Sequence, residues 1–228
     1  MLAVEIASDH IDVTVGFNGS SIELFGDRRD SNAHIAIVVE GPRKTVTIWQ
    51  KSRVMGAWVN RHYTRFDKFP VYYHHASSLP DEGVEGLNAV LLENGIGHKG
   101  LLHKQKDKVK SSNKKENEFY KALIIKNIKA GVFFDKPAEI TFLNDNFFRA
   151  SFSIPPSAPT GEYKIHSYMI DNKGKVIEKT LDMLKVEQVG LNAFVFKSAR
   201  DYSLIYALLC ISLAMFSGWL VSVLRVRP

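Results

Sequence analysis

The 228-residue sequence predicts a mainly β fold: an Ig-like antiparallel β-sandwich that is interrupted by a helical insertion and followed by a single C-terminal transmembrane helix. Short runs that alternate apolar and polar residues predict the strands. A change to helical spacing after residue 77 predicts the insertion, and an uncharged stretch near the C-terminus predicts the membrane span. The predicted segments are 1–76 (β), 77–131 (helical insertion with a Lys-rich loop), 132–190 (β), 191–201 (juxtamembrane), 202–224 (transmembrane helix) and 225–228 (basic tail).

Residues 3–75 read as strands. Alternation is clear in His10–Val15, Ser21–Phe25 and Lys44–Trp49, and Asn18-Gly19 supplies a turn. His34–Val39 is continuously apolar, which is typical of a central strand. We expect these strands to form half of the sandwich.

Helical spacing begins near Ser77–Glu82, where Pro80 and two acids make a helix start. We expect this helix to end at Asn94-Gly95. A Lys-rich mobile loop is expected over Lys104–Lys115, and a second helix over Glu116–Ala130, closed by Gly131.

Four further strands are expected after the insertion. They cover Glu139–Phe142, Phe147–Ile154, Glu162–Ile170 and Val176–Val186, with Asp171–Lys175 as the turn of a hairpin. The two β regions form either one sandwich or two small β-units with helices between them.

Tyr202–Leu224 contains no charged residue and is long enough to cross a hydrocarbon core of roughly 30 Å. A buried core helix of this length would show a polar face, so we predict a membrane span. Aromatic and basic side chains around it are expected at the membrane interface. These are Phe194, Phe196, Tyr202, Tyr206, Trp219, Arg225 and Arg227.

Charge and cysteine limit the possible functions. Lys99–Lys129 holds ten lysines and three acidic residues, so we interpret the net charge of +6 as a property of this segment rather than of the fold. Cys210, the single cysteine, lies inside the predicted span. The remaining chain therefore offers no thiolate nucleophile, zinc-thiolate site or iron–sulfur ligand.

A series of segments in order resembles a family of transmembrane proteins described from alphaproteobacteria. The segments are Ser8-Asp9-His10, Val15–Gly19, Leu24-Phe25-Gly26, Val39–Pro42, Arg53–Asn60, Ala158–Tyr163 and Val189–Phe196. The resemblance covers nearly the whole chain. It implies a domain in the periplasm, a C-terminal anchor in the inner membrane, an N-terminal export signal, and a neighbouring exporter-like membrane protein. The present sequence shows no such signal at Met1-Leu2-Ala3, and the family carries no catalytic residues to transfer.

Two motifs favour plain structural interpretations. Gly95–Gly100 matches G-x-G-x-x-G, but it follows a helical pattern instead of a strand, so we interpret it as a helix stop and turn. His74-His75, with His62 nearby, suggests a metal site, yet adjacent residues of a strand point to opposite faces. His10, His34 and His166 would need to converge in space. We expect no cofactor or metal.

Trp58, Asn60 and Arg61 form the candidate partner patch. Strand alternation places Trp58, Asn60 and His62 on one face and Arg61, Tyr63 and Arg65 on the other. The alternative is that Trp58 belongs to the sandwich core and the arginines to the solvent-exposed surface.

These observations favour a non-enzymatic accessory protein of the inner membrane, single-pass and largely periplasmic, which acts beside an integral-membrane partner and binds no nucleic acid. Two rivals stay open. One is an envelope metal-binding or hydrolytic enzyme tethered to the membrane. The other is a cytoplasmic tail-anchored protein whose Lys-rich arm binds nucleic acid or lipid; that function needs stacking aromatic residues, and only Phe119 and Tyr120 interrupt the lysines.

Overall fold

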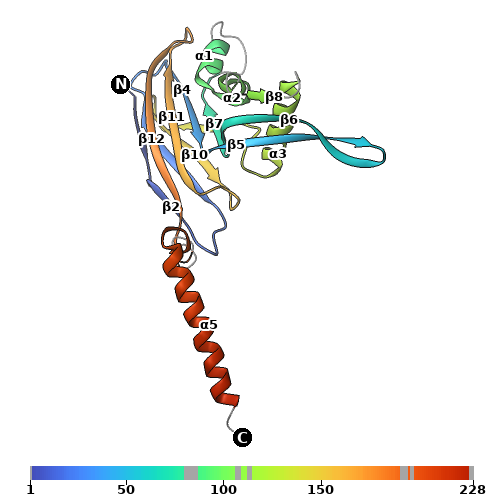
Figure 1. The fold of residues 1–228 in the computed structure, drawn as a ribbon. Coiled ribbons are helices and arrows are strands. Elements are labelled where there is room, and N and C mark those ends of the chain that lie inside the picture. Colours follow the sequence, from blue (N-terminus) through green and yellow to red (C-terminus); the bar gives the residue numbers. More distant parts are fainter. Residues whose placement is uncertain are drawn as a thin grey trace. The chain divides into compact units, whose positions relative to one another are not determined.

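The computed structural model describes residues 2–79, 87–105, 109–111, 115–190, 195 and 198–225. It divides into two compact units, residues 1–11 with 17–187 and residues 12–16 with 188–228. Among the described residues, the first unit contains three antiparallel sheets and three helices, and the second contains helix α5 (Figure 1). The predicted mainly β fold with one C-terminal apolar helix is confirmed.

The first sheet has the order β1 (Ala3–Ile6), β3 (Ser20–Asp27), β10 (Phe147–Ile154), β9 (Ile140–Phe142). Alternation sets its inner face, since every second residue of β10 is buried, from Phe148 to Ile154. The sheet therefore buries one apolar face and exposes the other.

The second sheet has the order β2 (His10–Val13), β12 (Val176–Gln188), β11 (Gly161–Ile170), β4 (His34–Glu40), β7 (Tyr73–Ser77). β4 lies between two strands and is buried at all but its first residue, so the predicted central strand is confirmed. The predicted hairpin between β11 and β12 is also present. The Asp171 carboxylate closes its turn by accepting hydrogen bonds from the amides of Lys173 and Lys175.

These two sheets lie against each other. The ring of His74 on β7 meets Phe152 on β10 at 5.3 Å between centroids. The Tyr72 hydroxyl donates to the carbonyl of Ser153 on β10 at 2.7 Å. The main apolar core fills the space between the two inner faces.

Three helices belong to the insertion: α1 (Leu87–Asn94), α2 (Gly97–Gln105) and α3 (Glu116–Lys129). α1 ends at Asn94, just before Gly95, where the sequence predicts a stop, but α2 begins at Gly97, in a region expected to be a turn and a loop. A Cβ on Gly100 would lie 2.5 Å from the Leu91 carbonyl, so this glycine permits the close approach of α2 to α1. α2 carries too few apolar residues to show helical periodicity, so the sequence pattern does not predict this helix.

Residues 104–115 are only partly the predicted loop. Lys104 and Gln105 belong to α2, and strand β8 (Val109–Ser111) pairs with β6 (Ala57–Pro70). The prediction of a mobile loop is wrong for these residues, because pairing with β6 provides hydrogen bonds that composition does not reveal. Residues 106–108 and 112–114 lie outside the described residues.

A third sheet consists of β5 (Arg43–Val54), β6 and β8. The sequence expectation assigned this region to the sandwich, and that is wrong. β5 and β6 pair with each other over 12 and 14 residues and extend past α3 and β8 as a two-stranded hairpin (Figure 1).

In the second unit, α5 (Ser203–Arg225) contains the predicted membrane span. Its Ser203–Leu224 segment has a mean hydropathy of 2.2, and none of it is buried in the fold. Tyr202 and Trp219 are exposed, as are the large aliphatic side chains of α5, and their place at the membrane interface stays a prediction. Phe194, Phe196 and Arg227, which the sequence also assigns to the interface, lie outside the described residues.

Candidate functional site

The outer part of the β5–β6 hairpin is open to solvent, since every residue from Arg53 to Arg61 is exposed. Its strands are joined by a two-residue turn, Met55-Gly56, in which both residues have positive φ (49° and 86°). This backbone matches the twist of a two-stranded ribbon. Met55 is fully exposed and Trp58 is 69% exposed. The alternative that placed Trp58 in the core is therefore wrong.

A β-bulge at Arg61 changes which side chains share a face. The register moves from Gln50 opposite His62 to Lys51 opposite Asn60, which leaves Arg61 without an opposite residue. The predicted alternation is wrong for this reason, because one extra residue reverses the orientation of all residues beyond it.

Directly opposite residues of an antiparallel pair lie on the same face. One face of the hairpin therefore carries Arg53 opposite Trp58, Lys51 opposite Asn60, Trp49 opposite Tyr63, and Thr47 opposite Arg65. We call this set the aromatic–cationic face. β8 extends it, because Lys110 lies opposite Arg65.

The aromatic rings of this face are ordered by contact. Trp49 and Tyr63 lie 5.0 Å apart between ring centroids, and Trp49 is 49% exposed. Each presents an apolar ring and one polar atom on an exposed surface. The face therefore combines a fixed aromatic platform with cations on both sides.

The opposite face is partly covered where the hairpin meets the domain. Phe66 is fully buried and lies against Tyr120 of α3, with centroids 6.2 Å apart. A hollow of about 260 Å³ is lined by Ile48, Trp49 and Gln50 of β5 and by residues of α3, including Phe119. α3 therefore holds the base of the hairpin, while the outer half has no such cover among the described residues.

Charge is concentrated on this element. Arg43–Pro70 holds seven basic residues and one acidic residue, a net charge of +6. The interpretation that basicity belongs to the Lys-rich segment alone is thus wrong, since the hairpin forms a second basic segment beside it. Two of its cations are neutralised near the base. Arg43 pairs with the buried carboxylate of Glu40, and Arg65 bonds Asp67 at 2.8 Å and lowers the pKa of that carboxyl group.

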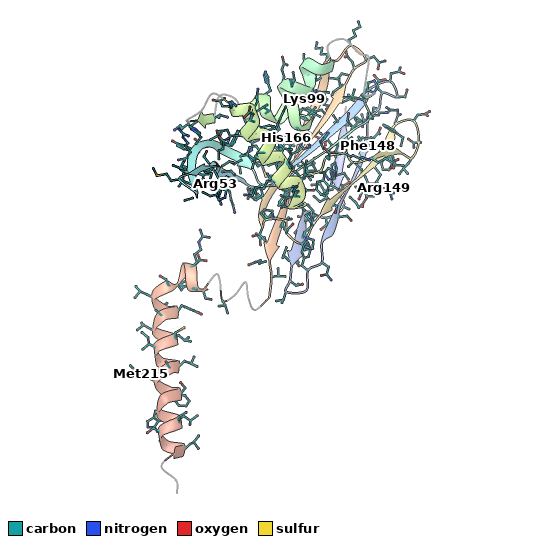
Figure 2. The ribbon with its side chains drawn as sticks, turned by 90° about the vertical axis from the view of Figure 1, so that its right-hand side faces the viewer. Arg53, Lys99, Phe148, Arg149, His166 and Met215 are labelled. Carbon is teal, nitrogen blue, oxygen red and sulfur yellow. The ribbon has the colours of Figure 1, made fainter. Side chains whose placement is uncertain are left out.

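The outer cations differ from those at the base. Among the residues that the structure describes, no ion pair involves Lys51, Arg53 or Arg61. Figure 2 shows Arg53 on the hairpin, at a distance from Phe148 and Arg149 on β10. The outer half of the hairpin therefore presents cationic charge that its own domain does not compensate.

Comparison with known protein families agrees with the membrane helix. The family described as "Putative transmembrane protein (Alph_Pro_TM)" matches residues 1–227. The chain belongs to this family. Among curated proteins, none matches the chain. Membership confirms the resemblance seen in the sequence and, with α5, places the protein in a membrane.

The histidines highlighted by the sequence do not form a metal site in the described part of the chain. His74 stacks on Phe134 with centroids 3.9 Å apart, whereas His75 lies near His98 at 6.0 Å. Burial lowers the pKa of both His74 and His75 to about 4. His74 is a neutral buried residue of the core, and His75 is a neutral half-buried residue beside it.

The predicted patch is partly assembled. Trp58 and Asn60 do share a face, while Arg61 occupies the bulge beside it. The sequence did not indicate Trp49, Lys51 and Arg53. They lie on β5, which pairs with the strand that carries Trp58. A possible signal was Met55-Gly56, a turn between two alternating runs, although methionine is an unusual residue at positive φ.

Proposed function

We propose that this family member is a non-enzymatic accessory protein of the inner membrane, with its β domain in the periplasm and its hairpin docked on an integral-membrane, exporter-like partner. One observation carries this proposal: the aromatic–cationic face is exposed, its Trp49 and Tyr63 rings are in contact, and the described residues give no ion pair to the cations of its outer half. Tryptophan, tyrosine and arginine are the residue types that dominate binding energy at protein interfaces.

Membrane tethering supports a docking role. α5 confines the domain to the bilayer that would contain such a partner, which raises their effective concentration. A modest direct affinity is then sufficient for stable association. Arg225 and Arg227 follow the span and Lys197 and Arg200 precede it, so basic residues lie on both sides and the periplasmic placement rests on what the family resemblance implies.

Site-specific photocrosslinking in membranes of a cell that expresses the partner tests the docking role. A photoreactive residue at Asn60, on the aromatic–cationic face, should yield a discrete crosslinked membrane protein. The same residue at Gln50, exposed on the opposite face, is the matched control. Equal crosslinking from both positions, or none from Asn60, would contradict the docking face. Reporter fusions at the two ends of the chain test the sidedness separately.

Nucleic-acid binding is a second candidate because the hairpin supplies what the Lys-rich segment lacks. Trp49 and Tyr63 lie beside Lys51 on a folded face, and single-stranded nucleic acids bind to such stacking platforms flanked by cations. This function requires a cytoplasmic domain. Salt-sensitive binding of an oligonucleotide by the full chain, lost on Trp49→Ala, together with a cytoplasmic reporter signal, would favour it over docking.

A further inference from the structure

The tip of the hairpin differs from the face behind it because it carries no charge. Val54–Asn60 contains no ionisable residue, and its large apolar side chains are open to solvent. The exposed fractions are 43% for Val54, 104% for Met55, 69% for Trp58 and 42% for Val59. Both strands contribute to this apolar tip, so it is a compact cap rather than isolated exposed residues.

Cations surround the apolar tip on its domain side. Arg53 precedes it on β5 and lies opposite Trp58, Lys51 is two residues further back opposite Asn60, and Arg61 follows Asn60 on β6. No acidic residue lies between Arg43 and Phe66. A surface with this charge pattern favours a negatively charged counterpart that lies just outside an apolar layer.

We propose that the apolar tip inserts into the interface of an anionic lipid bilayer, with Lys51, Arg53 and Arg61 at the level of the headgroups. Met55 is two positions beyond Arg53, which at about 3.4 Å per residue places it roughly 7 Å beyond Arg53, while Trp58 is level with Arg53. Interfacial elements bury their apolar side chains about 5–10 Å into the headgroup and acyl boundary. The spacing on the hairpin therefore matches the layering of a membrane surface.

The backbone also suits entry into this layer. A hairpin pairs most of its amides and carbonyls across its two strands, and Val54 is paired with Ala57 directly beneath the turn. Few polar backbone groups would be left without partners in the interface. Met55 keeps a positive φ of 49° where glycine or asparagine would be relaxed, so the tip carries an apolar side chain at a conformational cost.

The observations favour lipid over nucleic acid for the tip itself. Phosphate recognition explains the cations, but it gives no reason for exposed Met55 and Val54 beyond them. A bilayer accounts for both layers, and α5 already holds the protein on one. As in the proposed function, the hairpin is the element that makes contact. The tip binds lipid, and the aromatic–cationic face behind it binds the partner.

A fluorescent label at the tip tests the proposal on the full chain. Cys210 is the only cysteine, so Cys210→Ser provides a background without thiols. Met55→Cys then carries an environment-sensitive fluorophore, and Lys173→Cys, in the exposed turn between β11 and β12, is the matched control. Each protein is reconstituted in vesicles of phosphatidylcholine alone or with phosphatidylglycerol, and circular dichroism verifies that the domain is folded.

In phosphatidylglycerol vesicles we expect a blue-shifted emission of the label at position 55 and quenching by lipid-attached nitroxides. Both signals should decline in high salt, and the label at position 173 should show neither. Adding Arg53→Gln and Arg61→Gln should lower the ratio of inserted to free tip by about 30-fold, because each basic residue at an anionic surface contributes about fivefold.

Four results would overturn the proposal. A water-like emission from position 55 in both kinds of vesicle excludes insertion. Equal insertion in both lipids excludes the headgroup role of the cations. A shift that requires added oligonucleotide assigns the tip to nucleic acid instead. A shift seen only in native membranes that contain the partner also overturns the lipid assignment, but it supports the docking function, so the two proposals fail separately.

Discussion

The two ends of strand β6 have opposite environments. At its C-terminal end, Phe66 and Phe69 are fully buried and contact Tyr120 of α3. At its N-terminal end, Trp58 and Val59 are exposed, although they are equally apolar. One strand therefore stabilises the domain at one end and presents a surface at the other. The difference implies that stability and binding can be altered independently along a single element.

Removing an aromatic ring from the base should have the largest effect. Phe69→Ala would leave a cavity among Phe66, Tyr120 and Phe133, and we expect a loss of about 3–5 kcal/mol in the free energy of unfolding. Denaturant titration of the full chain in detergent, followed by near-ultraviolet circular dichroism, measures this loss. A change below about 1 kcal/mol would show that α3 does not anchor the hairpin.

Acid should destabilise the domain core and leave the tip unaffected. Burial lowers the pKa of His74 to about 4, whereas the unfolded chain titrates near 6.5. Between these two pH values the unfolded state therefore binds more protons than the folded state. The contribution of His74 to the free energy of unfolding is lost as the pH falls from about 6.5 to 4. We expect about 3 kcal/mol for His74, because its pKa falls by about 2.5 and each pKa unit corresponds to about 1.4 kcal/mol.

The variant His74→Phe checks this assignment. Phenylalanine can keep the stacking on Phe134, and it cannot be protonated. The difference in unfolding free energy between pH 7 and pH 4.5 should become smaller. The difference that is left is expected from His75 and His166, because burial also lowers their pKa values. An unchanged difference would remove His74 as a source of the acid sensitivity.

A substitution in the turn should raise the stability of the protein and weaken the binding of the tip to the membrane. Met55→Gly removes a side chain from a residue with φ of 49°, and we expect a gain of about 1 kcal/mol in stability. The same change removes the most exposed apolar side chain of the tip. Thermal unfolding together with vesicle quenching from a label at Val54→Cys measures both properties. A loss of stability would show that Met55 packs against the hairpin.

The smallest effect on stability is expected at the predicted patch. Trp58→Ala should change the free energy of unfolding by no more than about 0.5 kcal/mol, because the ring is 69% exposed. Trp49→Ala, which also removes the contact with Tyr63, is the comparison and should cost more. Crosslinking from Asn60 should decline in both variants. A large destabilisation by Trp58→Ala would assign the ring a structural role.

The sequence predicts the local elements well where period and composition are strong. Alternation locates β10, continuous apolarity identifies β4 as central, and the uncharged segment locates α5. α3 begins at Glu116 as expected and ends just before Gly131, which has a φ of 72°. α2 escapes prediction because it is stabilised by close packing on α1 rather than by an apolar stripe of its own.

The candidate site was only half predictable. The residue types at Trp58, Asn60 and Arg61 indicated a surface for recognition, but their neighbours on β5 are set by strand pairing. The bulge at Arg61 determines which residues share a face, and no pattern in the sequence predicts this bulge. Trp49 and Lys51 therefore joined the site only through the register.

By itself the sequence determined the membrane span, the β-rich class and the basic character of the chain, because each depends on composition or local period. The tertiary structure decided that β5 and β6 leave the two main sheets to form an exposed hairpin. It also decided that the two basic segments, the hairpin and the Lys-rich segment, lie side by side, since Lys110 on β8 is paired with Arg65 on β6. Pairing and register depend on contacts between distant residues, and these contacts convert scattered aromatic and cationic side chains into one surface.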